Sequence, residues 1–390
     1  MTIIDRIADA HAEMTGWRRD IHAHPETAFE EHRTSALVAE KLESFGIEVH
    51  RGLAGTGVVG RLKAGSGNRA IGLRADMDAL HIAERNDFGH KSRNDGKMHA
   101  CGHDGHTTML LGAARHLAET GNFDGTIYFI FQPAEENEGG ARVMIEEGLF
   151  ETFPVEAVYG MHNMPGVPVG RFAVRPGPMM AAFDVFEMRI TGKASHAALP
   201  HQSIDPVVAA AQVVTALQTI ASRTTDPAQS VVVTVTQFHG GDTWNVIPDE
   251  VVLRGTTRAF RDDVQDAIEP AIRRIAGGVC EAFGARMELH YERRYPATVN
   301  SPDETELAAR VAAEVVGGAN VDRDPAPLMG SEDFAFMLRE RPGCYIWIGN
   351  GPGEGGCVLH NPRYDFNDEI LPIGASYWVH LAETALARTA

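Results

Sequence analysis

The feature that most constrains the fold is a series of short, β-rich apolar runs separated by helical segments. The runs cover residues 58–62, 70–74, 126–131, 155–159 and 345–348. Apolar spacing typical of helices occurs at 2–22, 28–45, 104–120, 138–148, 303–317, 331–340 and 370–388. Apolar runs this short, alternating with helices, are typical of a sheet that helices cover on both faces. The sequence therefore predicts an α/β fold.

The middle of the chain follows a different order. Its predicted elements are a strand (184–191), a helix (206–222), two strands (230–238 and 250–259), a helix (262–283) and a strand (286–294). This β-α-β-β-α-β order is that of a ferredoxin-like domain. Turn-rich stretches with proline flank it, as is usual at domain boundaries. We therefore expect an inserted domain at 182–295, and a larger domain formed by 1–181 and 296–390.

Charge and composition exclude several classes of partner. The 390 residues include 35 Lys and Arg against 53 Asp and Glu, a net charge of −18. Such a charge disfavours nucleic acid and anionic membrane surfaces. The sequence has no apolar run of about 18 residues, no apolar core of a signal peptide and only four cysteines, which predicts a cytoplasmic protein without a membrane span.

Metal-capable or acidic side chains follow most of the predicted strands. In chain order they are Asp76 and Asp78, the group His99, Cys101, His103, Asp104 and His106 before a helix, Glu135 and Glu136, His162, and His360. Ligands of open α/β sheets bind beyond the carboxyl ends of the strands. We therefore expect these side chains to meet at one edge of the sheet.

The residue types indicate which chemistry occurs there. A thiolate, imidazoles and a carboxylate together suit borderline divalent ions such as Zn, Mn, Co or Ni. The set Cys101, His103, Glu136, His162 and His360 is one ligand too many for a single tetrahedral site, which favours two metal ions with a bridging water. Glu135, beside the ligand Glu136, can then act as a general base.

Ten motifs in a fixed order resemble the M20 metallopeptidase/amidohydrolase family over nearly the whole chain. They are HAHPETAFEEHRT (22–34), LRADMDAL (73–80), HACGHDGH (99–106), FQPAEENEGGA (131–141), GMHN (160–163), GKASHAALPH (192–201), NVIP (245–248), RGTTRAF (254–260), MGSEDFAF (329–336) and LHNPRYDF (359–366). The similarity is greatest to the branch that contains hippurate hydrolase, N-acyl-amino-acid amidohydrolases and auxin-conjugate hydrolases. Cys101, where other branches carry an acidic residue, assigns this branch. The resemblance implies a zinc-peptidase-like catalytic domain with a mixed sheet flanked by helices.

The resemblance also implies roles for individual residues. The five metal-capable residues above would bind two divalent ions, and Glu135 would activate the bridging water. Asp78 would orient a ligand or support Glu135. His196 would stabilise the oxyanion, in its own or a partner subunit's site. Asn245 and Arg258 would hold polar groups and a carboxylate of the substrate.

The implied reaction is hydrolysis of an N-acyl or N-aroyl amino acid to a carboxylic acid and a free amino acid. The inserted domain would mediate a homodimer, with a tetramer as the alternative. Three other interpretations stay open: a thiol amidohydrolase with Cys101 as nucleophile, a metallo-dipeptidase or aminopeptidase, and a non-catalytic metal- or peptide-binding protein. The native metal, the acyl group, the preferred amino acid and the roles of His99, His106 and His201 are not determined by the sequence.

Overall fold

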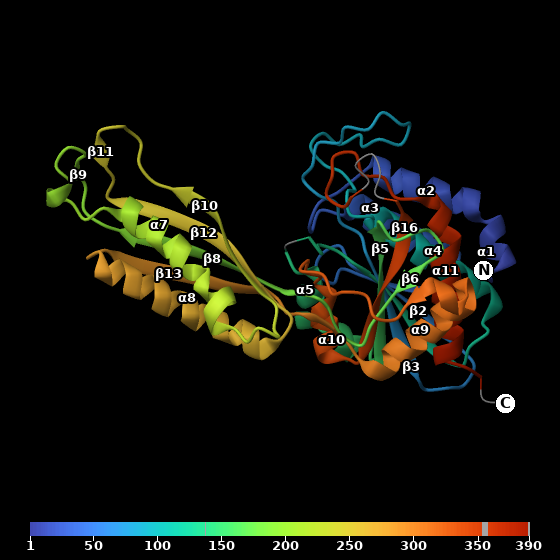
Figure 1. Cartoon of the computed structure of the whole chain (residues 1–390). Helices are drawn as coiled ribbons and strands as arrows, with labels where there is room; N and C mark the ends of the chain where they lie inside the picture. The colour runs from blue at the N-terminus through green and yellow to red at the C-terminus, as the bar shows by residue number, and fades with distance from the viewer. Residues whose placement is uncertain (137, 353–357, 389–390) are drawn as a thin grey trace. The chain divides into compact units, whose positions relative to one another are not determined.

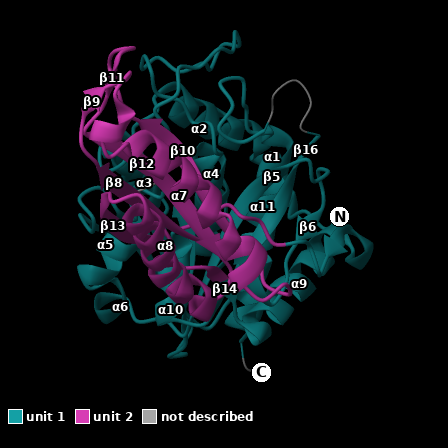
Figure 2. Ribbon diagram, turned by 60° about the vertical axis from the view of Figure 1, so that its left-hand side comes forward, with its two compact units in different colours: residues 1–179, 299–326, 333–390 teal, residues 180–298, 327–332 magenta. Residues whose placement is uncertain are grey.

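The computed structural model describes residues 1–136, 138–352 and 358–388. The chain divides into two compact units (Figure 2). Unit 1 contains Met1–Met179, Val299–Ala326 and Asp333–Ala390, and unit 2 contains Met180–Thr298 and Pro327–Glu332. Residues 327–332, which the sequence places in the larger domain, thus belong to the second unit.

Unit 1 is built on a mixed sheet of eight strands. They are β1 (Glu48–Arg51), β2 (Val58–Ala64), β3 (Ala70–Asp76), β4 (Gly125–Gln132), β5 (Ala157–Pro165), β6 (Phe172–Ala173), β15 (Val321–Asp322) and β16 (Gly343–Gly351). Their order across the sheet is β1-β2-β4-β3-β5-β16-β6-β15. The four central strands β4, β3, β5 and β16 run parallel, whereas β2 and β6 run antiparallel to their central neighbours. The predicted mixed sheet is therefore confirmed.

Helices cover both faces of this sheet (Figure 1). The helices of unit 1 are α1 (Asp5–Asp9), α2 (His11–Ala23), α3 (His32–Ser44), α4 (His103–Thr120), α5 (Gly140–Glu146), α6 (Leu149–Thr152), α9 (Pro302–Val316), α10 (Phe334–Glu340) and α11 (Leu371–Ala385), with short turns η3 (Gly318–Asn320) and η5 (Asp368–Ile370). One face packs against α4 and α11, and α5 and α10 contact strands β4 and β5. Every residue of β4 is buried, as expected for a strand covered on both sides.

Two elements of unit 1 differ from the sequence prediction in ways that affect the site. The helix expected at 28–45 begins only at His32, because Phe29 has a left-handed backbone (φ 60°). The Glu26 carboxylate accepts hydrogen bonds from two backbone N–H groups in the first turn of α3, those of Arg33 and Thr34. Strand β5 continues to Pro165, so His162 lies within the strand, opposite Trp347, instead of after it.

Unit 2 has the predicted ferredoxin-like order. Its main elements are β8 (Ala182–Thr191), α7 (Pro206–Leu217), the π-turn η2 (Ile220–Thr224), β10 (Val231–His239), β12 (Glu250–Ala259), α8 (Asp262–Ala282) and β13 (Arg286–Tyr295). The antiparallel sheet has the order β10-β12-β8-β13, and α7 and α8 lie side by side on it (Figure 1). Val213 of α7 and Ile272 of α8 are fully buried in the core that the helices share with this sheet.

Shorter elements complete the chain. Unit 2 also contains a two-stranded sheet of β9 (Ser195–His196) and β11 (Val246–Ile247). The short turn η1 (Pro200–Gln202) follows β9 in the chain. The chain passes between the units within β7 (Gly177–Met180) and β14 (Thr298–Asn300). Each helix among the described residues is too short or too polar to span a bilayer.

Candidate metal centre

The central parallel strands of unit 1 bring the predicted site residues to one edge of the sheet. Strand β3 ends at Asp76, Glu135 follows β4, and His162 lies in the last part of β5. Helix α4 begins at His103, after Gly102 with φ 107°. A side chain at Gly102 would place Cβ only 2.1 Å from the Asn163 side-chain oxygen, so this close approach requires glycine.

The five predicted ligands form two groups that share one sulfur atom. Cys101, His103 and His162 form one group, and Cys101, Glu136 and His360 form the other. Within each group the potential ligand atoms lie within 4.8 Å of one another. Cys101 Sγ is 3.3 Å from His162 Nε2, and His360 Nε2 is 3.0 Å from Glu136 Oε1. A shared ligand with two separate pairs around it is the arrangement that two adjacent cations need.

Backbone contacts fix the imidazoles of His103 and His162 and the main chain of His360. His103 Nδ1 is 2.8 Å from the Asp78 carbonyl oxygen, and His162 Nδ1 is 2.6 Å from the Asn163 carbonyl oxygen. A carbonyl oxygen can only accept, so each Nδ1 carries a proton and Nε2 is the nitrogen left for a metal ion. His360 has a left-handed backbone (φ 62°), and its N–H donates to Ala100 O at 2.7 Å.

The polar atoms at the centre fit a bound cation. His103 Nε2 is buried and makes no hydrogen bond among the described residues, and Asp76 Oδ2 lies 3.7 Å from it. Burial, followed by the carboxylates of Glu136 and Glu135, raises the pKa of the Cys101 thiol well above its usual range. Burial lowers the pKa of His103, but the Asp76 and Asp78 carboxylates outweigh it and raise that pKa to about 10. Carboxylates and a thiol gathered around buried imidazoles form an excess of negative charge that a bound cation would offset.

Asp78 connects the predicted base to the predicted ligands. Its Oδ1 accepts a hydrogen bond from Glu135 N at 3.0 Å, and its Oδ2 accepts one from Glu136 N at 2.9 Å. Asp78 Oδ1 also lies 3.2 Å from His103 Nδ1. The side chain of Glu135 is buried, and its Oε1 accepts from Asp333 N at 3.3 Å. Glu135 also has a carboxylate oxygen within 4.8 Å of possible ligand atoms of His103 and Glu136.

A buried ionic network supports this edge of the sheet. Asp76 is bonded to His106 Nδ1 at 2.7 Å and to Arg74 Nη1 at 2.8 Å. Arg74 Nη2 donates to Asp333 at 3.1 Å, so one guanidinium joins two fully buried carboxylates. Neither Arg74 nor Asp333 was predicted as a site residue; the position of Arg74 as a charged residue inside an apolar strand could have indicated it. His99 is buried, and neither ring nitrogen has a partner among the described residues.

The other three predicted site residues belong to unit 2. His196 pairs with Val246 in the small β9–β11 sheet, and Ala197 N donates to Asn245 O at 2.9 Å. His196 and Asn245 thus lie on adjoining segments of the chain, and both residues are exposed. Arg258, on β12, is half-buried, and its guanidinium lies 4.1 Å from the centre of the Phe183 ring. His201 is exposed in η1.

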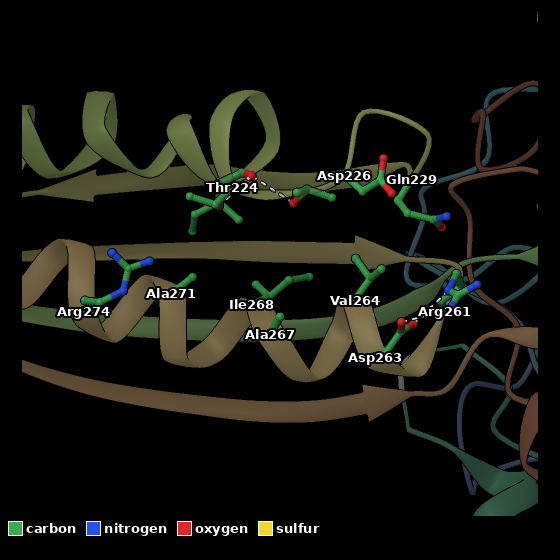
Figure 3. Close-up of a pocket in the computed structure, with 12 residues that line it drawn as sticks. Thr224, Asp226, Gln229, Arg261, Asp263, Val264, Ala267, Ile268, Ala271 and Arg274 are labelled. Atoms are coloured by element: carbon green, nitrogen blue, oxygen red, sulfur yellow. Dashed lines mark hydrogen bonds and ion pairs between the residues drawn. The ribbon is translucent and has the colours of Figure 1, made fainter.

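Unit 2 also contains a cavity of about 520 Å³ between η2 and α8 (Figure 3). Arg261 and Asp263 form an ion pair at one end, and Val264 and Ile268 contribute apolar surface. None of the predicted site residues lines this cavity.

Comparisons with known proteins agree with this geometry. The profile of peptidase family M20/M25/M40 matches residues 72–384. Hippurate hydrolase from Campylobacter jejuni is 41% identical over 382 residues, covering 98% of this chain and 99% of the relative. N-acetylcysteine deacetylase from Bacillus subtilis is 39% identical over 380 residues, covering 96% and 97%.

The fold has close counterparts among solved structures. One of them, from Bacillus subtilis, is described as a dinuclear metal-binding peptidase of the M20 family. It superimposes with a TM-score of 0.84 at 35% identity and covers 97% of this chain and 99% of its own. The sequence resemblance is thus confirmed over nearly the full length of the chain, which belongs to peptidase family M20/M25/M40.

Proposed function

We propose that this M20 protein is a metal-dependent amidohydrolase that cleaves N-acyl or N-aroyl amino acids to a carboxylic acid and a free amino acid. The observation that carries the proposal is the pair of ligand groups sharing Cys101, with the buried carboxylate of Glu135 beside them. The names of the relatives, hippurate hydrolase and N-acetylcysteine deacetylase, support the substrate class.

In this proposal, the five ligands would hold two divalent ions (Mn, Zn, Co or Ni). Cys101 belongs to both ligand groups, His103 and His162 to one, and Glu136 and His360 to the other. When bound, such a pair polarises an amide carbonyl and lowers the pKa of water. The mixture of thiolate, imidazole and carboxylate donors suits any of the four metals.

The residues of the chain then divide the proton transfers and the binding of substrate. Glu135 accepts a proton from the attacking water and later delivers it to the amide nitrogen that leaves. The Asp78 carboxylate keeps Glu135 in place by accepting a hydrogen bond from the backbone N–H of Glu135. His196 donates a hydrogen bond to the developing oxyanion, in its own or a partner subunit's site, and Asn245 and Arg258 hold polar groups and the carboxylate of the substrate.

A substrate panel tests this function directly. The protein is stripped of metal, reloaded separately with Mn, Zn, Co and Ni, and assayed on N-acetyl and N-benzoyl amino acids beside free dipeptides. We expect kcat/KM for the best acylated substrate to exceed that for the matched dipeptide at least about tenfold, because an acylated nitrogen has no ammonium charge to desolvate. A preference for dipeptides would instead indicate a metallo-dipeptidase or aminopeptidase.

We further propose a homodimer formed through unit 2, with a tetramer as the larger alternative, and a cytoplasmic location. Trp244 is fully exposed, and Phe238 and Val246 are more than 40% exposed on the same unit. Strand β10 is an edge strand of its sheet, and exposed apolar residues beside an unpaired edge favour association. The buried, free thiols of Cys101, Cys280 and Cys344 suit a reducing compartment.

Trp244→Asp is expected to dissociate this dimer, because it places a charge in an apolar interface. Sedimentation should give twice the chain mass of 42.3 kDa for the unchanged protein and about one chain mass for the variant. Phe283→Asp is the control, since Phe283 is exposed in unit 2 but lies outside β9, β10 and β11. A monomeric unchanged protein, or a variant that stays dimeric, would contradict the proposal.

A further inference from the structure

The turn that carries Glu135 has a strained backbone. Ala134, the residue before it, is fully buried and has a left-handed conformation with φ 54°. That conformation is unfavourable for a residue with a Cβ atom, which comes too close to the following carbonyl oxygen. Ala134 O accepts from Gly140 N at 2.9 Å, and a Cβ on Gly140 would lie 1.8 Å from Pro133 O. Because the turn is strained and tightly packed, contacts from elsewhere must hold it.

Two carboxylates from distant loops bind three successive backbone N–H groups of this turn. Glu31 Oε1 accepts from Ala134 N at 2.9 Å, while the Asp78 carboxylate accepts from Glu135 N and Glu136 N. Successive N–H groups next to a left-handed residue form a concavity that binds anions. Here the N–H groups are bound by carboxyl groups of the protein itself. The sequence predicted the role of Asp78 but gave no indication of Glu31.

The Glu31 side chain bonds to Ala134 and does not cap helix α3, which follows it in the chain. Glu31 directly precedes α3, yet its side chain makes no capping bond there, and the Glu26 carboxylate accepts from the first N–H groups instead. Glu31 is fully buried, and its Oε1 also accepts from Phe29 N at 3.1 Å. The hydroxyl of Thr56 donates to its other oxygen at 2.6 Å. The Glu31 carboxyl group thus accepts hydrogen bonds from two left-handed residues, Phe29 and Ala134, and the Thr56 hydroxyl holds it in position.

We propose that Glu31 is a positioning residue for Glu135: by accepting from Ala134 N, it fixes the turn that orients the base toward the substrate amide. The inference rests on the proposed function, in which Glu135 transfers the protons. Displacement of a catalytic group by about 1 Å can cost about 10²-fold in rate. The Glu31 side chain bonds to Phe29, Thr56 and Ala134, none of which is a metal ligand, so its effect should fall on proton transfer and leave metal binding intact.

The test compares Glu31→Ala and Glu31→Gln on the full chain with both metals loaded. Glu31→Ala should lower kcat by about 10- to 100-fold while KM stays within about twofold, because the base moves and the substrate contacts do not. Metal content, measured by elemental analysis, should stay at two ions per chain. Glu31→Gln keeps an oxygen for Ala134 N and should restore kcat to within about threefold of the unchanged protein.

Glu30→Gln is the matched control, since Glu30 is the exposed neighbour in the same loop. It should change neither kcat nor KM. Thr56→Val removes the hydroxyl that anchors Glu31. This variant replaces Glu31→Ala in the test if Glu31→Ala does not fold. This variant should lower kcat about threefold to tenfold at unchanged KM, in line with the loss of one hydrogen bond to a charged group. An unchanged kcat in Thr56→Val would overturn the inference.

Glu135→Gln is measured in parallel to separate two kinds of failure. If Glu135→Gln keeps near-normal turnover, the proposed function itself is wrong. If Glu135→Gln is inactive but Glu31→Ala stays within threefold of the unchanged kcat, only the role of Glu31 is overturned. The same conclusion follows if Glu31→Ala loses metal, or if Glu31→Gln is as slow as Glu31→Ala, because Glu31 would then serve the metal centre or the fold.

Discussion

Glu135→Gln should lower kcat by about 10²- to 10⁴-fold, the usual contribution of a general acid–base residue. The amide of Gln has nearly the shape of the carboxylate, so it can keep the hydrogen bond from Asp333 N to the side-chain oxygen. It cannot accept the proton of the attacking water or return it to the leaving nitrogen. The backbone bond from residue 135 to Asp78 does not depend on the side chain and should persist.

Steady-state kinetics and elemental analysis on the same preparation check this result. The variant should retain two ions per chain, because Glu135 lies outside the five-ligand set. Glu138→Gln provides a matched control, since Glu138 is exposed in the same segment of the chain. Near-normal turnover of Glu135→Gln with both ions bound would remove Glu135 from the mechanism.

Removal of the metal ions should abolish hydrolysis, with a loss of at least about 10³-fold, because carbonyl polarisation supplies several kcal/mol. Cys101→Ala should reproduce the loss even with metal added, since it deletes the atom that both ligand groups share. Cys101→Asp retains an anionic ligand and should recover part of the activity with Mn, which prefers oxygen donors.

The same experiment separates the metal mechanism from a thiol mechanism. Cys101 Sγ lies 3.3 Å from His162 Nε2, a distance that would also suit a nucleophile and its base. A thiol enzyme would keep its activity after exhaustive chelation and lose all of it in Cys101→Asp. Cys280→Ala, which alters a buried thiol of unit 2, is the control for general effects of cysteine replacement.

The sequence predicted the elements whose signals are local. The central strands are short apolar runs, and each appears in the structure within a few residues of its expected position. Since parallel strands end at one edge, the side chains that follow them had to meet there. The sequence therefore predicted that Cys101, His103, Glu136 and His360 lie close together, as they do in the two ligand groups.

Features that depend on distant partners were not predictable in this way. Strands β6 and β15 have two residues each and exist only because neighbouring strands pair with them. Arg74 is charged yet fully buried, which the carboxylates of Asp76 and Asp333 make possible. The hydrogen bond from Ala134 N to the Glu31 side chain joins residues 103 positions apart, and no sequence pattern near either residue indicates it.

The discontinuity of unit 1 has a consequence for its biosynthesis. Four of the five metal-capable residues emerge from the ribosome within Met1–Met179, but His360 belongs to the last segment, Asp333–Ala390. That segment also supplies β16, which pairs with β5, and α11, which packs on α4. A nascent chain therefore presents apolar surface and an incomplete set of ligands until the segment that contains His360 has been made. We expect the complete centre to be loaded only after that segment has emerged from the ribosome.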